Sequence, residues 1–239
     1  MQKNEKISCS SCLNTNCFVL QFCTPEWIEL IDKEKYQTFY KQGQNIIHEG
    51  SPVLGIYFIQ KGKTKVLSTG LTGRQQIVRF ANDGHILGHR GVGNDVYPIS
   101  VVAMEDSVVC FIENNVLHDV FMSNPKFTYG LMMFYSRELR KMEDRMKNLA
   151  QMNIREKIAE SLLLVHEVFG VNAANELNVH FTREDIANVA GTTAEQVVRQ
   201  ITDFEEDGFI TKSGRKIVLL DLVGLRKIIY DHNPHFILE

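Results

Sequence analysis

The spacing of apolar residues changes near residue 125, and this change requires a β-rich part followed by helices. Between residues 36 and 112 the apolar residues form short β-branched and aromatic runs, such as YQTFY, KTKVLS, QQIVRFA and SVVCFI. Glycines interrupt these runs at intervals typical of hairpins. Short, regularly spaced strands with glycine turns predict an all-β sandwich or barrel.

From Pro125 to Met152 the apolar residues recur at steps of three and four, which indicates a long amphipathic helix. The apolar seam consists of Leu131, Tyr135, Leu139, Met142, Met146, Leu149 and Met152. A lone helix cannot bury such a seam, so we expect it to pair with a second copy of the chain. Packing of the seam on the chain's own β-domain is the alternative.

The stretch FTREDIANVAGTTAEQVVRQITDFEEDGFI, residues 181–210, predicts two short helices joined by a tight turn. Thr182 is a good N-cap, with Asp185 three residues later. Gly191 closes the first helix, and Thr193 can cap the second. This pattern is that of a helix-turn-helix, whose second helix enters the major groove of DNA. The FITKSGRKIVLLD segment that follows predicts two strands, which form a wing.

Glu195 and Arg199 stand four residues apart on the polar face of the second helix. A surface ion pair is the ordinary interpretation of this spacing. In the N-terminal half of a recognition helix, arginine can instead hold guanine O6 and N7, and glutamate can accept from cytosine N4. We therefore predict that both residues read base edges. Phosphate contacts are expected from position for Thr182, Arg183, Thr192, Thr193, Lys212, Arg215 and Lys216.

Net charge gives no support for nucleic-acid binding. The formal net charge is −3, and from Ile154 onward 9 Lys and Arg face 14 Asp and Glu. DNA binding must therefore use a local patch. No apolar run reaches the roughly 20 residues of a membrane span, and the first residues lack the pattern of a signal peptide. We expect a cytoplasmic protein that does not contact a membrane.

The β-rich part, the long helix and TREDIANVAGTTAEQVVRQITDFEEDGFI with its wing resemble the CRP/FNR superfamily of bacterial transcription regulators. The resemblance implies an α+β fold in four parts: a cysteine-rich leader at 1–24, a double-stranded β-helix (jelly-roll) sensor domain at 25–124, a dimerisation helix at 125–152 and a winged-helix DNA-binding domain at 153–239. It also implies a homodimer on palindromic double-stranded DNA with a TGA-like core, and contact with RNA polymerase. Ala194 and Val198 depart from family residues beside the base readers, which leaves the flanking base preference open.

Cyclic-nucleotide members of this family hold the ribose with a glutamate and the phosphate with an Arg-Ser pair. In the matching stretch GHILGHRGVGNDVYPISVVA, His89 stands at the glutamate position and Pro98–Ile99 at the pair. A buried phosphate without a guanidinium partner would be badly compensated. We therefore expect no cyclic nucleotide.

Three of the five cysteines lie in CSSCLNTNC, residues 9–17, and Cys23 follows soon after. In a reducing compartment, clustered thiols are typical of metal ligands or redox groups. Four thiolates are the number and type of ligand that an iron–sulfur cluster takes, and we expect a 4Fe–4S cluster. The predicted ligands are Cys9, Cys12, Cys17 and Cys110. The first three belong to a leader that needs no secondary structure.

Oxygen-sensing FNR proteins are similar, with three N-terminal cysteines and one in the matching barrel strand. Their leader reads Cys-x2-Cys-x5-Cys, whereas the last spacing here is x4. The resemblance implies a sensor of oxygen, nitric oxide or redox state.

Other interpretations of the cysteines stay open. Zinc also accepts four cysteines, Cys110 alone could be a buried core thiol, and Cys23 could replace one ligand. The alternative function is a regulator of the same fold with a small effector or no cofactor. A thiol oxidoreductase is disfavoured, because Cys9-Ser-Ser-Cys12 lacks its βαβ context and other catalytic motifs are missing. We expect no enzyme activity.

Overall fold

The computed structural model describes residues 6–214, 216–229 and 232, which form two compact units. The first contains the described residues up to Thr69 together with Ala81–Glu138. The second contains Gly70–Phe80 and the described residues from Leu139 onward. No helix in the described ranges is long and apolar enough to cross a membrane.

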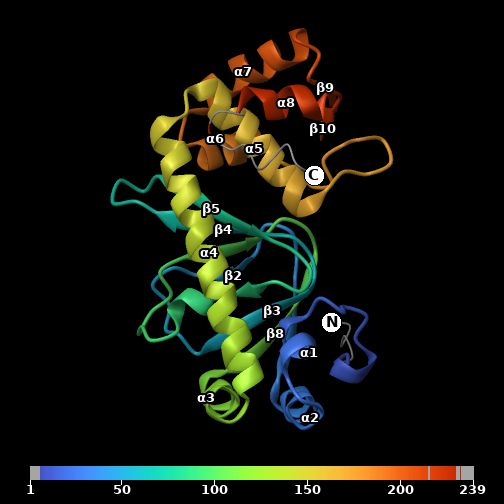
Figure 1. The fold of residues 1–239 in the computed structure, drawn as a ribbon, viewed down its shortest axis with the longest axis vertical. Coiled ribbons are helices and arrows are strands. Elements are labelled where there is room, and N and C mark those ends of the chain that lie inside the picture. The colour runs from blue at the N-terminus through green and yellow to red at the C-terminus, as the bar shows by residue number, and fades with distance from the viewer. Residues whose placement is uncertain (1–5, 215, 230–231, 233–239) are drawn as a thin grey trace. The chain divides into compact units, whose positions relative to one another are not determined.

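Two four-stranded sheets form the jelly roll, which Figure 1 draws as the arrows of the first unit. Their strand orders are β1-β8-β3-β6 and β2-β7-β4-β5. The strands are β1 (Tyr36–Tyr40), β2 (Asn45–Ile47), β3 (Gly55–Lys61), β4 (Thr64–Thr69), β5 (Gln75–Ala81), β6 (Ile86–Leu87), β7 (Ser100–Ala103) and β8 (Ser107–Glu113). The β1–β8, β3–β8 and β4–β7 pairings are antiparallel. The predicted β-rich domain is confirmed, and β2 and β6 are additional short strands that the sequence pattern does not predict.

Helices cover one face of the β1-β8-β3-β6 sheet in the first unit. They are α1 (Phe18–Phe22), α2 (Pro25–Glu34), α3 (Asn114–Ser123) and the first turns of α4 (Pro125–Gln151). Side chains from these helices pack with Ile56, Phe58 and Ile112 of the sheet in one hydrophobic cluster. The leader also has a 3-10 turn at Cys9–Ser11. The leader, for which the sequence analysis requires no secondary structure, thus contains this short turn and packs on the sheet.

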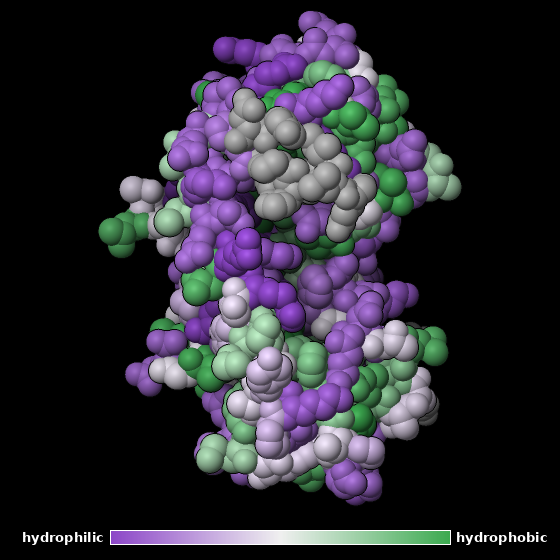
Figure 2. Space-filling model, viewed as in Figure 1, coloured by the Kyte–Doolittle hydropathy of each residue, from purple (hydrophilic) through white to green (hydrophobic). Residues whose placement is uncertain are grey.

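The apolar seam of α4 divides into buried and exposed residues. Leu131 is only 7% exposed and packs in the hydrophobic cluster of its own unit, so it is not available on the surface. Tyr135, Leu139, Met142 and Met146 are between 36% and 71% exposed. Leu149 is half-buried, and Met152 is buried. In Figure 2, hydrophilic and hydrophobic residues are interleaved over the surface where Figure 1 draws α4.

The second unit is a winged helix, as the sequence predicts. Its elements are α5 (Ile154–Phe169), α6 (Arg183–Ala190), α7 (Ala194–Glu206), β9 (Ile210–Ser213), β10 (Lys216–Leu219) and α8 (Leu222–Ile228). Thr182 and Asp185 form a capping box at the start of α6, and the Thr193 side chain accepts from Gln196 N–H at the start of α7. Gly191 ends α6 with φ +65, a left-handed conformation that favours glycine.

Candidate functional site

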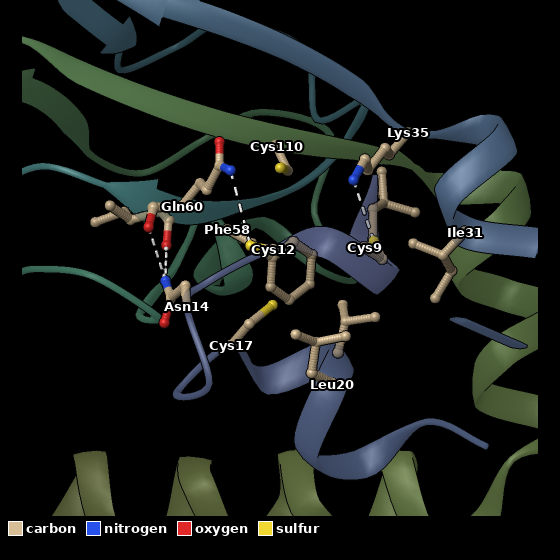
Figure 3. A pocket seen from close by; sticks show the side chains of 13 residues that line it. Cys9, Cys12, Asn14, Cys17, Leu20, Ile31, Lys35, Phe58, Gln60 and Cys110 are labelled. Carbon is tan, nitrogen blue, oxygen red and sulfur yellow. Dashed lines mark hydrogen bonds between the residues drawn. The ribbon is translucent and has the colours of Figure 1, made fainter. Parts of the chain in front are cut away.

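One pocket of the first unit is lined by four of the five cysteines (Figure 3). Cys9, Cys12 and Cys17 reach it from the leader, and Cys110 reaches it from β8. The other lining residues are Asn14, Val19, Leu20, Ile31, Lys35, Phe58, Ile59, Gln60 and Ile112. The structure therefore brings together all four side chains predicted as ligands, although the cysteine of β8 is remote from the others in sequence.

The register of the sheet places Cys110 at this pocket. It lies opposite Gln37 of β1 and opposite Phe58 of β3. Because successive strand residues point to opposite faces, Cys110 shares its face with Ile112, and Val109 points to the other face. The face that carries Cys110 is the one that the leader and the N-terminal helices cover.

Polar contacts hold the leader on the sheet. The Asn14 side chain donates to the carbonyl oxygens of Ile59, at 3.0 Å, and Gln60, at 2.8 Å. These bonds tie the loop between Cys12 and Cys17 to strand β3. Gly84 has a φ of +86, and a Cβ there would stand 2.6 Å from the carbonyl oxygen of Asn16. The leader backbone therefore passes so close that a larger residue would displace it.

Nitrogen donors face the sulfur atoms. Lys35 Nζ lies 3.1 Å from Cys9 Sγ, in a hydrogen bond that Figure 3 draws. Gln60 Nε2 lies 3.7 Å from Cys12 Sγ, and Gln37 Nε2 lies 3.7 Å from Cys110 Sγ. At Cys17, backbone N–H groups of α1 are the donors. N–H donors of this kind stabilise a thiolate more than a neutral thiol.

Burial nevertheless raises the pKa of three of the pocket thiols. It raises the pKa of Cys110 to about 11. Burial also raises the pKa of Cys17. At Cys9 burial raises the pKa as well, and the hydrogen bond from Lys35 only partly opposes it. A metal centre that binds here must displace these protons, so its binding is linked to pH.

The donor set of the pocket fits an iron–sulfur cluster. Its described lining holds four thiols and no carboxylate or imidazole, and soft thiolates select iron–sulfur clusters or zinc. In the described ranges, however, no three His, Cys, Asp or Glu side chains are placed to hold one metal ion. A four-iron cluster spreads its thiolates over four iron atoms and needs them further apart than one ion does. Four thiolates are a ligand set that an iron–sulfur cluster and zinc both accept.

Cys23 stands outside this pocket. It lies between α1 and α2, is 7% exposed and belongs to the hydrophobic cluster beneath the helices. Burial raises the pKa of its thiol to about 12. Cys23 therefore does not line the pocket, and it packs as a core residue.

On the second unit, α7 presents the predicted base readers to solvent. Glu195 and Arg199 are exposed, whereas Val197, Ile201 and Phe204 are buried. Within the described residues neither Glu195 nor Arg199 forms an ion pair, so the ordinary interpretation of their spacing does not apply in this structure.

The predicted phosphate contacts have varied surroundings. Thr182 and Thr193 use their hydroxyls as helix caps, Thr192 bonds Gln196, and Arg183 is exposed. Lys212 pairs with Glu205, and Lys216 Nζ lies 2.7 Å from Glu176 Oε2. Arg215 lies outside the described residues.

Comparison with known proteins finds two family models that match different parts of the chain. Residues 37–124 match the family model of the cyclic nucleotide-binding domain, and residues 156–228 match that of the Crp-like helix-turn-helix domain. The chain is 26% identical over 220 residues to the transcriptional activator protein FnrA of Stutzerimonas stutzeri, covering 91% of this chain and 90% of that protein. The chain belongs to the CRP/FNR family. It is a DNA-binding transcription regulator and not an enzyme, as the sequence predicts.

Two further proteins, one curated relative and one solved structure, are similar to this chain. The transcriptional activator protein anr of Pseudomonas aeruginosa is 27% identical over 218 residues, covering 88% of this chain and 89% of that protein. The structure of FixK2 from Bradyrhizobium japonicum shares the fold, with a TM-score of 0.72 and 24% identity. The structural match covers 81% of this chain and 96% of the FixK2 chain.

The sequence of this CRP/FNR chain gave no indication of three residues at the pocket. Lys35, Gln37 and Gln60 contact cysteine sulfurs, but a lysine near a helix end and glutamines on strands are ordinary surface residues by pattern. The strand register that places Gln37 opposite Cys110 could in principle be sought from pairing of β1 with β8. No pattern in the sequence indicates that Lys35 is buried.

Proposed function

We propose that this CRP/FNR regulator is controlled by a 4Fe–4S cluster bound through Cys9, Cys12, Cys17 and Cys110. The observation that carries the proposal is that thiols from the leader and from β8 line one pocket whose walls supply N–H donors to sulfur. Such a cluster supplies iron that reacts with oxygen or nitric oxide and that exchanges electrons. The signal is therefore oxygen, nitric oxide or redox state.

Helix α1 connects the thiols to α4. Cys17 is the N-cap of α1, and the next residue, Phe18, packs on two rings of α4. The ring centroid of Phe18 lies 5.1 Å from that of Phe127 and 6.3 Å from that of Phe134. Gly130 leaves room for Phe22, because a Cβ there would stand 2.6 Å from the Phe22 ring. The start of α1 is thus fixed at Cys17, and its rings rest in a notch on α4.

Through this contact, binding or loss of a cluster at the thiols can change the dimer equilibrium. While the four thiols share a common ligand, Cys17 holds α1 and its rings in place. When the thiols separate, α1 can shift along α4. We infer that the exposed seam residues Tyr135, Leu139, Met142 and Met146, with Leu149, form the homodimer interface. A shift at α1 then changes the population of dimers that can bind DNA.

DNA recognition follows from the second unit. Palindromic double-stranded DNA needs two readers about one helical turn apart, which a two-fold dimer supplies. Arg199 reads guanine and Glu195 reads cytosine in each half-site. Contact with RNA polymerase and a place in the cytoplasm follow from the family. We propose no cyclic nucleotide, since His89 is buried beside the rings of Phe134 and Tyr135 at the position of the family glutamate.

The test is anaerobic reconstitution followed by iron and sulfide analysis. Wild type should bind about four iron and four sulfide per chain and show visible absorption. Cys110→Ser should lose that absorption, whereas Cys23→Ser, the matched change of a buried thiol outside the pocket, should retain it. Colourless wild type would favour the alternative of a small effector or no cofactor. Full iron content in Cys110→Ser would overturn the ligand assignment.

A further inference from the structure

Lys35 is a buried cation at the wall of the cysteine pocket. Its side chain is only 3% exposed. Its Nζ donates to Asp32 Oδ1 at 2.9 Å, to the Ile7 carbonyl oxygen at 2.8 Å and to Cys9 Sγ at 3.1 Å. These three contacts match the three protons of an ammonium group. Burial of an ammonium is unfavourable unless its charge is compensated, and one carboxylate does so here.

Asp32 holds the backbone N–H of Cys9, and Lys35 holds its sulfur atom. Asp32 Oδ1 accepts from the backbone N–H of Cys9 at 2.8 Å, and Asp32 Oδ2 accepts from the Ser8 hydroxyl at 2.6 Å. Lys35 donates to the sulfur of the same cysteine. The ion pair therefore fixes the position of Cys9 relative to α2, independently of any bound group.

The lysine two residues earlier shows that this helix does not require a buried cation. Lys33 lies in the last turn of α2, just before the C-cap Lys35, but its side chain is 67% exposed and its Nζ pairs with Glu29 Oε1 at 2.9 Å on the surface. Of these two lysines, Lys35 is the one turned toward sulfur, as Figure 3 shows for its Nζ and Cys9. A cation beside the sulfur atoms would stabilise negative charge that accumulates at the pocket.

A four-thiolate cluster site gathers such charge, because four thiolates bring more negative charge than the iron–sulfur core offsets. In a partly buried site, a neighbouring cation interacts with that charge more strongly than it would in water. One-electron reduction adds a further negative charge. Positive charge nearby therefore favours the reduced state and raises the reduction potential, which depends on net charge and on hydrogen bonds to sulfur.

We propose that Lys35 is a positioning residue for the thiolate site: with Asp32 it holds Cys9 at the pocket, and its ammonium group places positive charge beside the sulfur ligands. The effect of this charge on a cluster rests on the proposed function. The anchoring of Cys9 does not, so the two parts are measured in different states of the protein.

The anchoring is tested in the metal-free full-length protein by hydrogen exchange of the peptide around Cys9. In Lys35→Met the Cys9 amide should exchange about tenfold faster than in wild type, because a charge-assisted anchor is lost. Lys33→Met, the matched change at the exposed lysine two residues earlier, should exchange like wild type. Lys35→Arg should restore most of the protection. Equal exchange in Lys35→Met and wild type would overturn the anchoring.

The charge is tested by anaerobic redox titration of reconstituted protein with dithionite and mediators. The midpoint potential of Lys35→Met should be more negative than that of wild type, whereas Lys33→Met and Lys35→Arg should match wild type. Lys35→Gln keeps a donor, loses the charge and serves if Lys35→Met does not load. An unchanged potential in a fully loaded neutral variant would overturn the proposed effect of the charge. Wild type without iron would overturn the proposed function, while hydrogen exchange would still decide the anchoring.

Discussion

Cys110 lies directly opposite Gln37 in the β1–β8 register, and the Gln37 amide nitrogen is 3.7 Å from its sulfur. The same amide lies 2.7 Å from Gln60 Oε1, and Gln60 in turn faces Cys12. Two glutamines on neighbouring parts of one sheet thus connect the distant cysteine with the leader. One wall of the pocket is therefore built by side chains of the sheet, whose positions the strand register sets.

Binding at the cysteine pocket should strengthen with rising pH. Burial raises the pKa of Cys110 to about 11, so its thiol is protonated near neutrality and a metal centre must displace that proton. Iron incorporation under limiting iron should therefore be greater at pH 9 than at pH 7 in wild type, each measured by bound iron after gel filtration. Incorporation that is independent of pH would contradict protonated free thiols.

The metal-free fold should lose stability at high pH through the same thiol. The folded pKa of Cys110, about 11, stands above the ordinary value of 9.0. The unfolded thiol therefore ionises first, and the contribution of the buried neutral thiol is lost as pH rises from about 9 to about 11. Urea unfolding should show a steeper loss in wild type than in Cys110→Ser over this range. Parallel pH profiles would count against the raised pKa.

A charge in the exposed part of the α4 seam should yield monomers. Leu139→Glu or Met142→Glu places a carboxylate where we infer that two copies pair, and operator binding should weaken with the loss of the dimer. Lys141→Glu changes charge on the opposite side of the same helix and is the matched control, which should remain dimeric. Sedimentation velocity provides the measurement. Dimers of unchanged stability in both seam variants would rule out this interface.

Filling the notch at Gly130 should disturb the contact between α1 and α4. Gly130→Val forces the Phe22 ring to move, since even a Cβ would stand 2.6 Å from it. Overpacking of this kind destabilises by about 1–3 kcal/mol. Arg137→Val introduces the same side chain at an exposed position of α4 and should have a much smaller effect on urea unfolding. Equal stability of the two variants would mean that α1 does not rest in the notch.

Loss of the predicted guanine reader should relax sequence preference. Arg199→Ala should weaken binding by about 1–3 kcal/mol per half-site and lose discrimination at the contacted base. Lys216→Ala is the comparison at a predicted phosphate contact: it should weaken all sequences alike and reduce the salt dependence. Selection from a random operator library reports both. The base assignment fails if Arg199→Ala selects the wild-type operator.

The parts of the fold that depend on local sequence could be predicted. Thr182, Asp185, Gly191 and Thr193 mark the helix-turn-helix because caps and turns act over a few residues. The repeat of apolar residues at steps of three and four likewise predicts the long helix α4. Thiolate chemistry and the resemblance to oxygen-sensing FNR proteins together grouped four of the five cysteines, and the structure places these four at one pocket.

Tertiary contacts decide the rest. Leu131 and Leu139 lie on one apolar seam, yet only the first is buried, because it packs in the hydrophobic cluster that also contains residues of α1 and α2. Strands β2 and β6 are too short to show an alternating pattern. Lys35 is buried only because Asp32, Ile7 and Cys9 converge on it in three dimensions.

The most direct test of cluster control is the operator affinity of one anaerobic preparation, measured before and after removal of its iron, with iron content determined in both states. The account predicts at least about a tenfold change in Kd, corresponding to roughly 1.4 kcal/mol of coupling between the thiol site and DNA. Cys110→Ser should give a single affinity regardless of treatment, whereas Cys23→Ser should respond like wild type. An operator Kd that is the same for iron-loaded and iron-free wild type would contradict the account.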